Sequence, residues 1–336
     1  MENIKKLIIS TILCLLTALL LLPANVFAAG EIETDKDVTL TIQYRHAGEA
    51  IVGAGFNLYH VATVTTEGVY ELTGDFVSYP VSLDGLNTKE WQALAETLVG
   101  YVLRDKLMPL DSGKTDDKGL LLFPTGMVSM KPGLYLVTSP QFVIGKHTYT
   151  ASSFLVALPN IEEDEWNYDV TAVPKYDLEI EKDPTTPPPT PPTTSTPKPS
   201  GYITRKVLKI WDDKGNEAAR PKEVIVQLLC NGEVYDTKTL NAKNNWRYTW
   251  DNLEKKYTWS IVEKEVPEYT VLVSLEGITF AVTNTYKPTG PEILPPKGPG
   301  KLPQTGVLWW PVAILAVSGL FFIILGGITH KKNANK

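Results

Sequence analysis

The sequence predicts a mainly β protein with two tandem β-sandwich (Ig-like) domains, the first of which contains one inserted helix. Two observations lead to this fold class. Segments in which apolar and polar residues alternate, as in strands with one buried face, recur through residues 30–182 and 201–287. Between them, residues 183–200 are rich in proline and threonine and cannot bury a core, so they form a linker between two folding units.

The first domain, residues 30–182, has several segments typical of strands. Apolar and polar residues alternate strictly in the first of them, and the last two are short apolar runs that predict buried strands. The four clearest segments are residues 38–44, 56–59, 133–137 and 154–158.

One helix interrupts these strands. Asn87 and Glu90 have the spacing of a capping box, which marks a helix N-terminus. Apolar residues then recur at helical spacing on one face: Trp91, Leu94, Ala95, Leu98 and Val102. We therefore expect a core-facing helix that packs on the sheet of this domain.

The second domain, residues 201–287, is predicted to be all-β. Its strands are separated by turn signals at residues 213–215 (Asp-Lys-Gly), 231–232 (Asn-Gly) and 251–252 (Asp-Asn), a spacing that suits a small Greek-key sandwich.

Three polar residues of this domain stand where the alternation predicts core. Lys209 shares a strand face with Val207 and Trp211, and Glu263 shares one with Trp259 and Ile261. Asn284 ends the series Ile278, Phe280 and Val282. Any one of the three, taken alone, also fits an exposed polar residue at the end of a strand.

Together the three residues suit one reaction. Burial lowers the pKa of a lysine amine and so makes it a neutral nucleophile. Burial also keeps a glutamic acid protonated, so that it can polarise a carboxamide and carry protons. Attack of the Lys209 amine on the Asn284 side chain would then release ammonia and leave an amide cross-link.

Residues 201–286 also resemble the B-type domain of collagen adhesins (CnaB). The resemblance is carried by Val-Leu-Lys209-Ile-Trp, Arg220-Pro221-Lys222, Asn245-Trp246, Trp-Ser-Ile-Val-Glu263 and Phe-Ala-Val-Thr-Asn284-Thr-Tyr. It implies an autocatalytic isopeptide bond between Lys209 and Asn284, with Glu263 as the catalytic acid. The segment that follows Glu263 is shorter than is usual in the family.

Both ends of the chain carry targeting patterns. Residues 1–29 combine Lys5 and Lys6 with an apolar run and small residues near Ala28, as in a secretory signal peptide. Near the other end, Leu302, Pro303, Gln304, Thr305 and Gly306 (residues 302–306) precede an apolar segment, residues 307–328, and a basic tail, residues 329–336.

This C-terminal order resembles a Gram-positive cell-wall sorting signal of the LPxTG type. The resemblance implies a transmembrane helix at residues 307–328 with a cytoplasmic tail, and cleavage by a sortase after Thr305. The Thr305 carboxyl would then be joined to an amine, while residues 288–301, rich in proline and glycine, would act as a wall spacer. The alternative is a permanent single-span membrane protein.

The end of the first domain resembles the pilin motif WxxxVxVYPK. Four residues match at the right spacing: Trp166, Val170, Pro174 and Lys175. Ala172 and Val173 depart from it. The resemblance makes Lys175 a candidate acceptor lysine, against the alternative of an ordinary surface lysine. Gln43 and Arg45 stand where a cross-linking lysine would be expected, so we predict no isopeptide bond of the same arrangement in this domain.

Composition excludes several classes of function. The net charge is −6, and loss of the two termini would remove further positive charge, so nucleic acid is not an expected partner. Cys230 is the only cysteine outside the signal segment, which leaves no intrachain disulfide. The sequence contains no catalytic motif and no pattern of metal ligands, so we expect no enzyme, no cofactor and no metal.

These observations predict a secreted structural protein that is covalently attached to the cell wall after a transient stay in the plasma membrane. A minor, basal pilin suits the short two-domain body, with sortase, the peptidoglycan cross-bridge and other pilin subunits as partners. A shaft pilin is the alternative within this class. A stand-alone adhesin that binds a host or matrix ligand is the alternative outside it.

Overall fold

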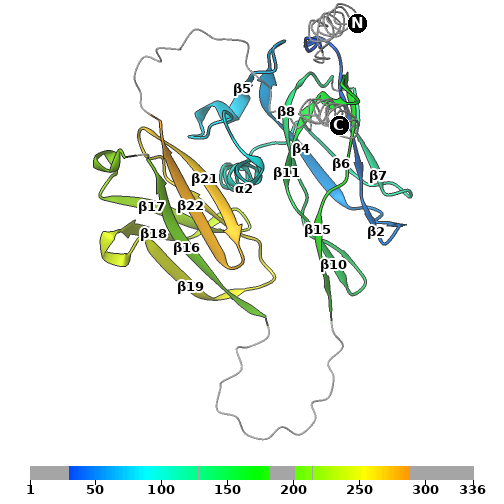
Figure 1. Ribbon diagram of the computed structural model, residues 1–336. Helices are drawn as coiled ribbons and strands as arrows, with labels where there is room; N and C mark the ends of the chain where they lie inside the picture. The colour runs from blue at the N-terminus through cyan, green and yellow to red at the C-terminus, as the bar shows by residue number, and fades with distance from the viewer. Residues whose placement is uncertain (1–29, 128, 182–200, 214, 288–336) are drawn as a thin grey trace, which may run out of the picture. The chain divides into compact units, whose positions relative to one another are not determined.

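The computed structural model describes residues 30–127, 129–181, 201–213 and 215–287 (Figure 1). The predicted signal peptide, the linker, the spacer, the sorting motif with Leu302, Pro303, Thr305 and Gly306, the transmembrane segment and the tail all lie outside these residues. Within them the prediction of a mainly β protein with one α-helix is confirmed. None of the described helices has the length and apolar character needed to span a bilayer.

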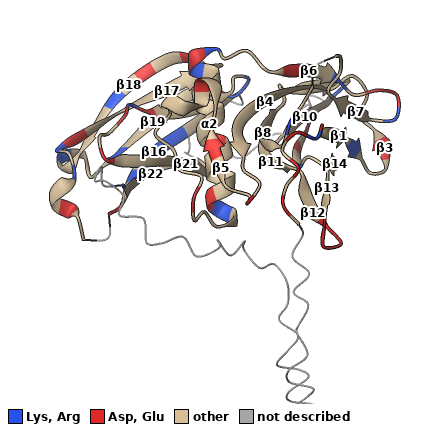
Figure 2. Ribbon diagram, turned by 90° about the horizontal axis from the view of Figure 1, so that it is seen from above, with Lys and Arg blue, Asp and Glu red and all other residues tan. Residues whose placement is uncertain are grey.

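The first domain, residues 30–181, consists of short strands around the helix α2. Its elements are β1 (Thr39–Gln43), β2 (Arg45–His46), β3 (Glu49–Ala50), β4 (Gly55–Val64), β5 (Tyr70–Leu72), η1 (Gly74–Ser78), α2 (Thr88–Asp105), β6 (Asp111–Lys114), β7 (Leu120–Phe123), β8 (Gly133–Thr138), β9 (Phe142–Ile144), β10 (His147–Ala151), β11 (Phe154–Leu158), β12 (Asn160–Glu162), β13 (Glu165–Asn167), β14 (Asp169–Ala172) and β15 (Tyr176–Ile180). The β12–β13 hairpin is strongly acidic and is drawn as a red loop in Figure 2.

The central sheet of this domain has the order β11-β8-β4-β5, and β6 also pairs with β4. Alternate residues of β8 enter two different hydrophobic clusters: Tyr135 and Val137 pack toward the sheet β14-β1-β7, whereas Leu134 and Leu136 pack toward α2. The strand is therefore buried on both faces, which explains its continuous apolar sequence.

Helix α2 begins with the predicted capping box. The Asn87 side chain accepts hydrogen bonds from the backbone N–H groups of Lys89 and Glu90, and the Glu90 carboxylate accepts one from the Asn87 N–H. The helix ends at Asp105 and is capped by Lys106, whose backbone is left-handed (φ 53°). Two sets of residues on the helix are buried. One is the predicted apolar stripe, in which Leu94, Ala95, Leu98 and Val102 are buried and Trp91 is only partly buried, and the other consists of Ala93, Thr97, Gly100 and Tyr101.

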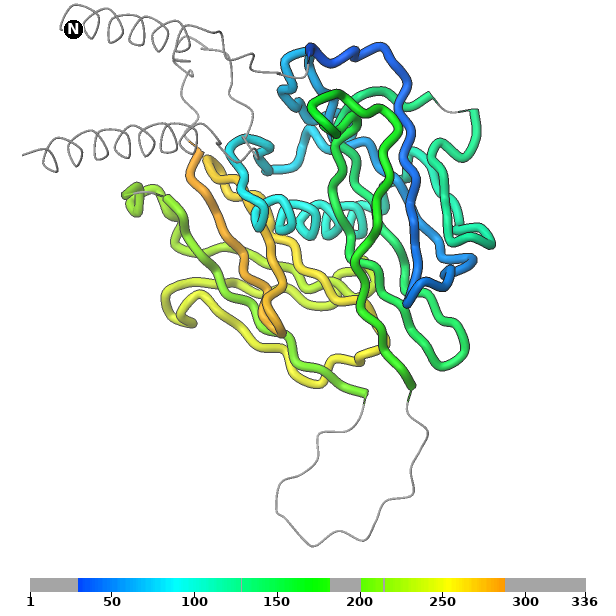
Figure 3. The backbone as a smooth tube through the Cα atoms, turned by 45° about the vertical axis from the view of Figure 1, so that its right-hand side comes forward, coloured from blue at the N-terminus to red at the C-terminus, as the bar shows by residue number. Residues whose placement is uncertain are grey.

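The second domain, residues 201–287, is a sandwich of two sheets with the orders β19-β16-β22-β21 and β18-β17-β20. The first and last strands, β16 and β22, lie side by side and run parallel (Figure 3). Its elements are β16 (Tyr202–Asp212), η2 (Glu217–Ala219), β17 (Glu223–Cys230), β18 (Glu233–Asn241), η3 (Ala242–Asn244), β19 (Arg247–Glu254), β20 (Trp259–Glu263), β21 (Tyr269–Glu276) and β22 (Thr279–Tyr286).

Two of the predicted turn signals have different outcomes. Asn231 and Gly232 form the tight β17–β18 hairpin turn, with φ angles of 50° and 88°. Asp251 and Asn252, predicted to separate two strands, lie inside β19 instead. Asn252 has a φ of 59°, and the pairing with β16 shifts by one residue there, so this pair forms a β-bulge.

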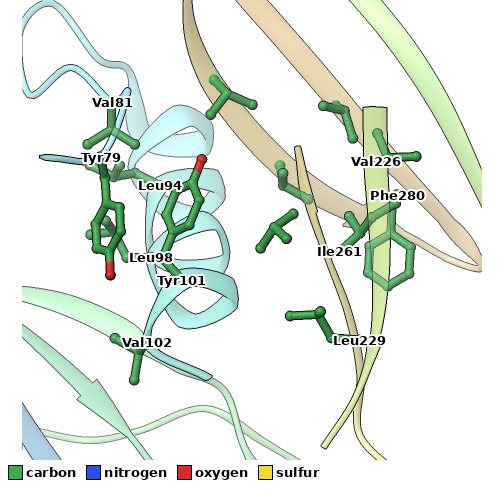
Figure 4. Close-up of a cluster of buried hydrophobic side chains, with 14 of the residues drawn as sticks. Tyr79, Val81, Leu94, Leu98, Tyr101, Val102, Val226, Leu229, Ile261 and Phe280 are labelled. Atoms are coloured by element: carbon green, nitrogen blue, oxygen red, sulfur yellow. The ribbon is translucent and has the colours of Figure 1, made fainter. Parts of the chain in front are cut away.

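Helix α2 belongs to a core that both domains share. The hydrophobic cluster around Leu94 and Leu98 continues into Val226, Ile261 and Phe280 of the second domain (Figure 4). The sequence predicted that this helix packs on the sheet of its own domain, which it does, but it also covers β20 and the edge strand β21. The N–H groups of Val271 and Val273 on that edge donate to Pro80 O and Thr97 Oγ1.

Candidate functional site

The amine of Lys209 lies inside the second sandwich because of its position on β16. Residues 207, 209 and 211 share the inner face of this strand, and Lys209 is only 4% exposed. In the parallel pairing with β22, Lys209 is opposite Val282 and Trp211 is opposite Asn284. Asn284 is therefore a diagonal neighbour of Lys209 on the same inner face, and it is 1% exposed.

Glu263 reaches these two residues from the other sheet. It is the last residue of β20, it pairs with Val226 of β17, and it is 2% exposed. Lys209 Nζ is 3.6 Å from Glu263 Oε1, and both side chains are almost completely shielded from solvent. The fold thus brings together all three residues that the sequence predicted for the cross-link, from three strands of two sheets.

The polar atoms of this site are poorly satisfied. Lys209 Nζ donates to the backbone carbonyls of Ile210 and Val282, at 3.1 Å each, and lies 4.3 Å from the centre of the Trp211 ring. In contrast, Glu263 Oε1 and both side-chain amide atoms of Asn284 are buried with no hydrogen-bond partner in the described structure. Each such atom costs about 1–3 kcal/mol, so the arrangement calls for a functional explanation.

The electrostatics suit a neutral amine beside a protonated acid. Burial lowers the pKa of Lys209 to about 8, although the nearby charge of Glu263 opposes this shift. Burial raises the pKa of Glu263, against the opposing effects of Lys209 and Asn284. In both residues desolvation of the charged form dominates, and it favours an uncharged nucleophile and a carboxylic acid that can donate a proton.

An ion pair closes one side of the site. Asp213, which follows β16 and is 3% exposed, accepts hydrogen bonds from both Nε and a terminal nitrogen of Arg220. The Arg220 side chain holds the pKa of Asp213 below its ordinary value. The guanidinium also lies 5.9 Å from the centre of the Trp211 ring, which in turn covers Lys209.

The candidate acceptor Lys175 lies elsewhere and is exposed. It follows β14, where Val170 and Pro174 are buried and so fix the chain before it. Its carbonyl accepts a hydrogen bond from the N–H of Ser152. Lys175 lines a groove of about 1220 Å³, together with residues that include Phe154 and Leu272.

The other acidic residues do not form a site. Glu162 and Glu163 lie on the exposed β12–β13 hairpin. Among the described residues, no group of three or more His, Cys, Asp or Glu side chains is arranged to hold a metal ion.

One neighbour of the site was missed at the sequence level. Tyr101 of α2 and Glu263 line the same small chamber, although they are far apart in the sequence. A signal existed in Gly100, a glycine in the interior of a strongly predicted helix, because such a residue marks close approach of another segment. The sequence does not say which segment approaches.

Comparison with protein families identifies the second domain. Residues 205–285 match the Cna protein B-type domain. These residues form a Cna B-type domain. The chain is also similar to a collagen adhesin of Staphylococcus aureus, with 36% identity over 101 residues. That similarity covers 28% of this chain and 8% of the length of the adhesin.

Two solved structures are similar to the chain at a low level. A single B repeat unit of the collagen-binding surface protein of S. aureus covers 75% of this chain and 99% of its own length, with 17% identity and a TM-score of 0.25. The major pilin SpaA of Corynebacterium diphtheriae covers 74% and 99%, with 12% identity and a TM-score of 0.24. TM-scores this low add nothing to the family match.

Proposed function

We propose that the chain is a wall-anchored structural pilin subunit whose Cna B-type domain is stabilised by an isopeptide bond between Lys209 and Asn284. The observation that carries this proposal is the buried group of Lys209, Glu263 and Asn284, with its amine 3.6 Å from the carboxyl. A lysine, an acid and an amide without full hydrogen bonding are costly in a core unless they react.

The reaction needs no co-reactant. The neutral Nζ of Lys209 forms a bond to Cγ of Asn284, and the bond between Cγ and Nδ2 breaks. One proton of Nζ passes through the Glu263 carboxyl to Nδ2, so that ammonia leaves and Glu263 ends as protonated as it began. The product is a secondary amide that replaces a buried amine and a buried primary amide.

The bond would join the first and last strands of the domain. These strands are parallel neighbours, so a bond between them resists their shearing apart. It also closes a loop of about 75 residues. By the loop-entropy model used for disulfides, this should stabilise the folded domain by roughly 4–5 kcal/mol. Unlike a disulfide, it cannot be reduced.

Intact-mass measurement of the purified chain tests this reaction. The wild type should have lost one ammonia, whereas Lys209→Ala, Asn284→Ala and Glu263→Gln should retain the unmodified mass. Glu263→Gln is the most informative variant, because it keeps the volume of the side chain and removes its acid. An unmodified wild-type mass would contradict the isopeptide proposal.

For the position of the chain in the envelope, the proposal is a minor, basal subunit. In this role Thr305 is joined to the peptidoglycan cross-bridge by a sortase, and the exposed amine of Lys175 accepts the last shaft subunit. The groove beside Lys175 supports this role, because the amine is accessible to an enzyme that carries an acylated chain.

High-mass ladders on detergent gels of cell-wall extracts test this role. We expect covalent ladders in the wild type and their loss in Lys175→Ala, with Lys114→Ala of the exposed strand β6 as a matched control. If Lys175 also becomes linked to Thr305 of a second copy, the chain is a shaft pilin instead.

A stand-alone adhesin is the second candidate, and it is favoured by the 36% identity to a protein named as a collagen adhesin. In that case the wall extract holds a single monomeric band, which Lys175→Ala leaves unchanged. Binding of the wild-type chain to a host or matrix ligand would then be its function.

A further inference from the structure

The cross-link site lies beside a small chamber between α2 and the Cna B-type domain. This chamber, of about 270 Å³, is lined by Tyr79, Tyr101 and Arg104 of the first domain and by Glu263 and Glu265 of the second. A water molecule occupies about 30 Å³ in the liquid, so the chamber admits several waters or a molecule of ammonia.

Tyr101 brings a polar group to this chamber from the first domain. Its ring is stacked on that of Tyr79, with centroids 4.3 Å apart and planes 9° from parallel, and the Arg104 guanidinium lies 4.8 Å from its centre. These contacts fix the ring. Yet the Tyr101 hydroxyl is buried with no hydrogen-bond partner in the described structure, and the same holds for Glu263 Oε1.

A bridging water would satisfy both of these buried oxygens. Burial raises the pKa of Tyr101, and the positive charge of Arg104 only opposes this effect in part, so the phenol remains a neutral donor. A donor on this side suits the carboxyl of Glu263, whose Oε1 accepts no hydrogen bond although Lys209 Nζ lies 3.6 Å away.

The helix backbone also approaches the strand that carries Glu263. A Cβ atom at Gly100 would lie 3.0 Å from Val262 Cγ1 and 3.2 Å from the Ile261 carbonyl oxygen. A larger residue would therefore move α2 away from β20. Glycine in the interior of a helix costs about 1 kcal/mol relative to alanine, and this close approach accounts for its presence here.

We propose that α2 of the first domain closes the cross-linking site of the second, with Tyr101 as a positioning residue for Glu263 and the chamber as the path by which ammonia leaves. The inference rests on the isopeptide reaction proposed above. It makes bond formation dependent on docking of the two domains, so that a cross-linked chain is one in which α2 has already packed on β20.

The rate of bond formation tests this inference. The full chain is purified in denaturant from inclusion bodies, diluted into detergent-containing buffers of different pH, and sampled for its intact mass. Tyr101→Phe should slow the loss of ammonia by about tenfold, less than the roughly 10²–10⁴-fold effect of a group that itself transfers the proton, because Tyr101 only positions Glu263. Tyr44→Phe is the matched control, because Tyr44 is also buried and its hydroxyl also has no partner.

The pH dependence of the rate of bond formation distinguishes a positioning role of Tyr101 from an effect of the substitution on folding alone. Four other charged residues line the chamber with Glu263, namely Asp75 of η1, Arg104 and Asp105 of α2 and Glu265 after β20, and Lys209 of β16 lies 3.6 Å from Glu263 Oε1. Loss of the Tyr101 donor should leave these in place and raise the pKa of Glu263 further. The alkaline limb of the rate profile should then move to higher pH in Tyr101→Phe and stay unchanged in Tyr44→Phe.

Gly100→Leu supplies a second test, because it acts on the helix and leaves every polar group in place. It should slow bond formation as well. A wild-type rate and profile in both Tyr101→Phe and Gly100→Leu would overturn the inference while leaving the isopeptide bond intact. A wild-type chain that never loses ammonia would instead overturn the proposed reaction.

Discussion

The backbone N–H of Val273 donates a hydrogen bond of 2.7 Å to the hydroxyl of Thr97, across 176 residues of sequence. Thr97 in turn donates to the Ala93 carbonyl one helical turn earlier, at 2.6 Å. One hydroxyl on α2 therefore satisfies a buried N–H on the edge strand of the other domain. Edge strands expose unpaired backbone groups and promote aggregation, and here α2 covers that edge.

Replacing Thr97 with valine should destabilise the docked pair of domains. Valine has nearly the same shape, but it leaves the Val273 N–H buried without an acceptor, which costs about 1–3 kcal/mol. Chemical denaturation of the wild type and variant measures this difference. Thr88→Val, on the exposed first turn of the same helix, is the control and should change stability by less than about 0.5 kcal/mol.

Gly100→Ala should lower the stability of the protein, although replacing a helical glycine with alanine usually raises it. Alanine in place of a helical glycine normally adds up to about 1 kcal/mol of stability. Here the new Cβ would press on Val262 and on the Ile261 carbonyl, and a backbone oxygen in a paired strand cannot move aside easily. We expect a lower Tm, and a higher Tm would show that α2 does not pack on β20 in solution.

Much of this architecture could be predicted from the sequence, because a period of two specifies which side chains of a strand point inward. This alternation put Lys209, Glu263 and Asn284 at core positions, although each taken alone also fitted an exposed strand end, and all three are buried. The capping box of Asn87 and Glu90 likewise depends only on local spacing.

What could not be predicted depends on contacts between distant segments. The apolar stripe of α2 indicated a buried face, but its second buried face consists of Ala93, Thr97, Gly100 and Tyr101, which are small or polar. Because such residues are not strongly apolar, the hydrophobic pattern does not reveal this face. It also does not indicate which strand the face covers. The prediction of a turn at Asn252 was wrong for a related reason. An asparagine with left-handed backbone angles occurs both in turns and in β-bulges, so the residue type does not distinguish the two.

An uncross-linked variant should show the lowered pKa of Lys209 as a pH dependence of stability. In Asn284→Ala the amine cannot react, so Lys209 remains free to titrate. Its pKa is about 8 in the folded chain and near 10.5 in the unfolded chain, so the unfolded chain binds more protons between these values. Stability should therefore rise with pH from about 8 to 10.5, by at most about 1.4 kcal/mol per pH unit.

Thermal denaturation across this range measures the effect, with Lys209→Met in the same Asn284→Ala background as the control. The double variant lacks the amine, and its stability should rise less with pH. Equal pH dependence in the two chains would mean that the Lys209 pKa is not lowered by burial.

Gly232→Ala should reveal the contact between the β17–β18 hairpin and the end of α2. Gly232 has a φ of 88°, and a Cβ there would lie 2.8 Å from the Leu103 carbonyl oxygen. Gly48, in the β2–β3 hairpin, has a φ of 90° and nothing within 4 Å of the same position. Both turns also begin with a residue at a φ of 50°, Asn231 and Ala47. The backbone strain of alanine, about 1–2 kcal/mol, is therefore common to the two sites.

The difference between Gly232→Ala and Gly48→Ala consequently isolates the contact with α2. We expect Gly232→Ala to cost at least about 1 kcal/mol more in the free energy of unfolding, because the hairpin must move away from the helix or strain against it. Equal losses in the two variants would place the hairpin out of reach of Leu103. The same pair of variants also bears on the cross-link, since a hairpin pushed off α2 would slow the loss of ammonia, whereas Gly48→Ala should not.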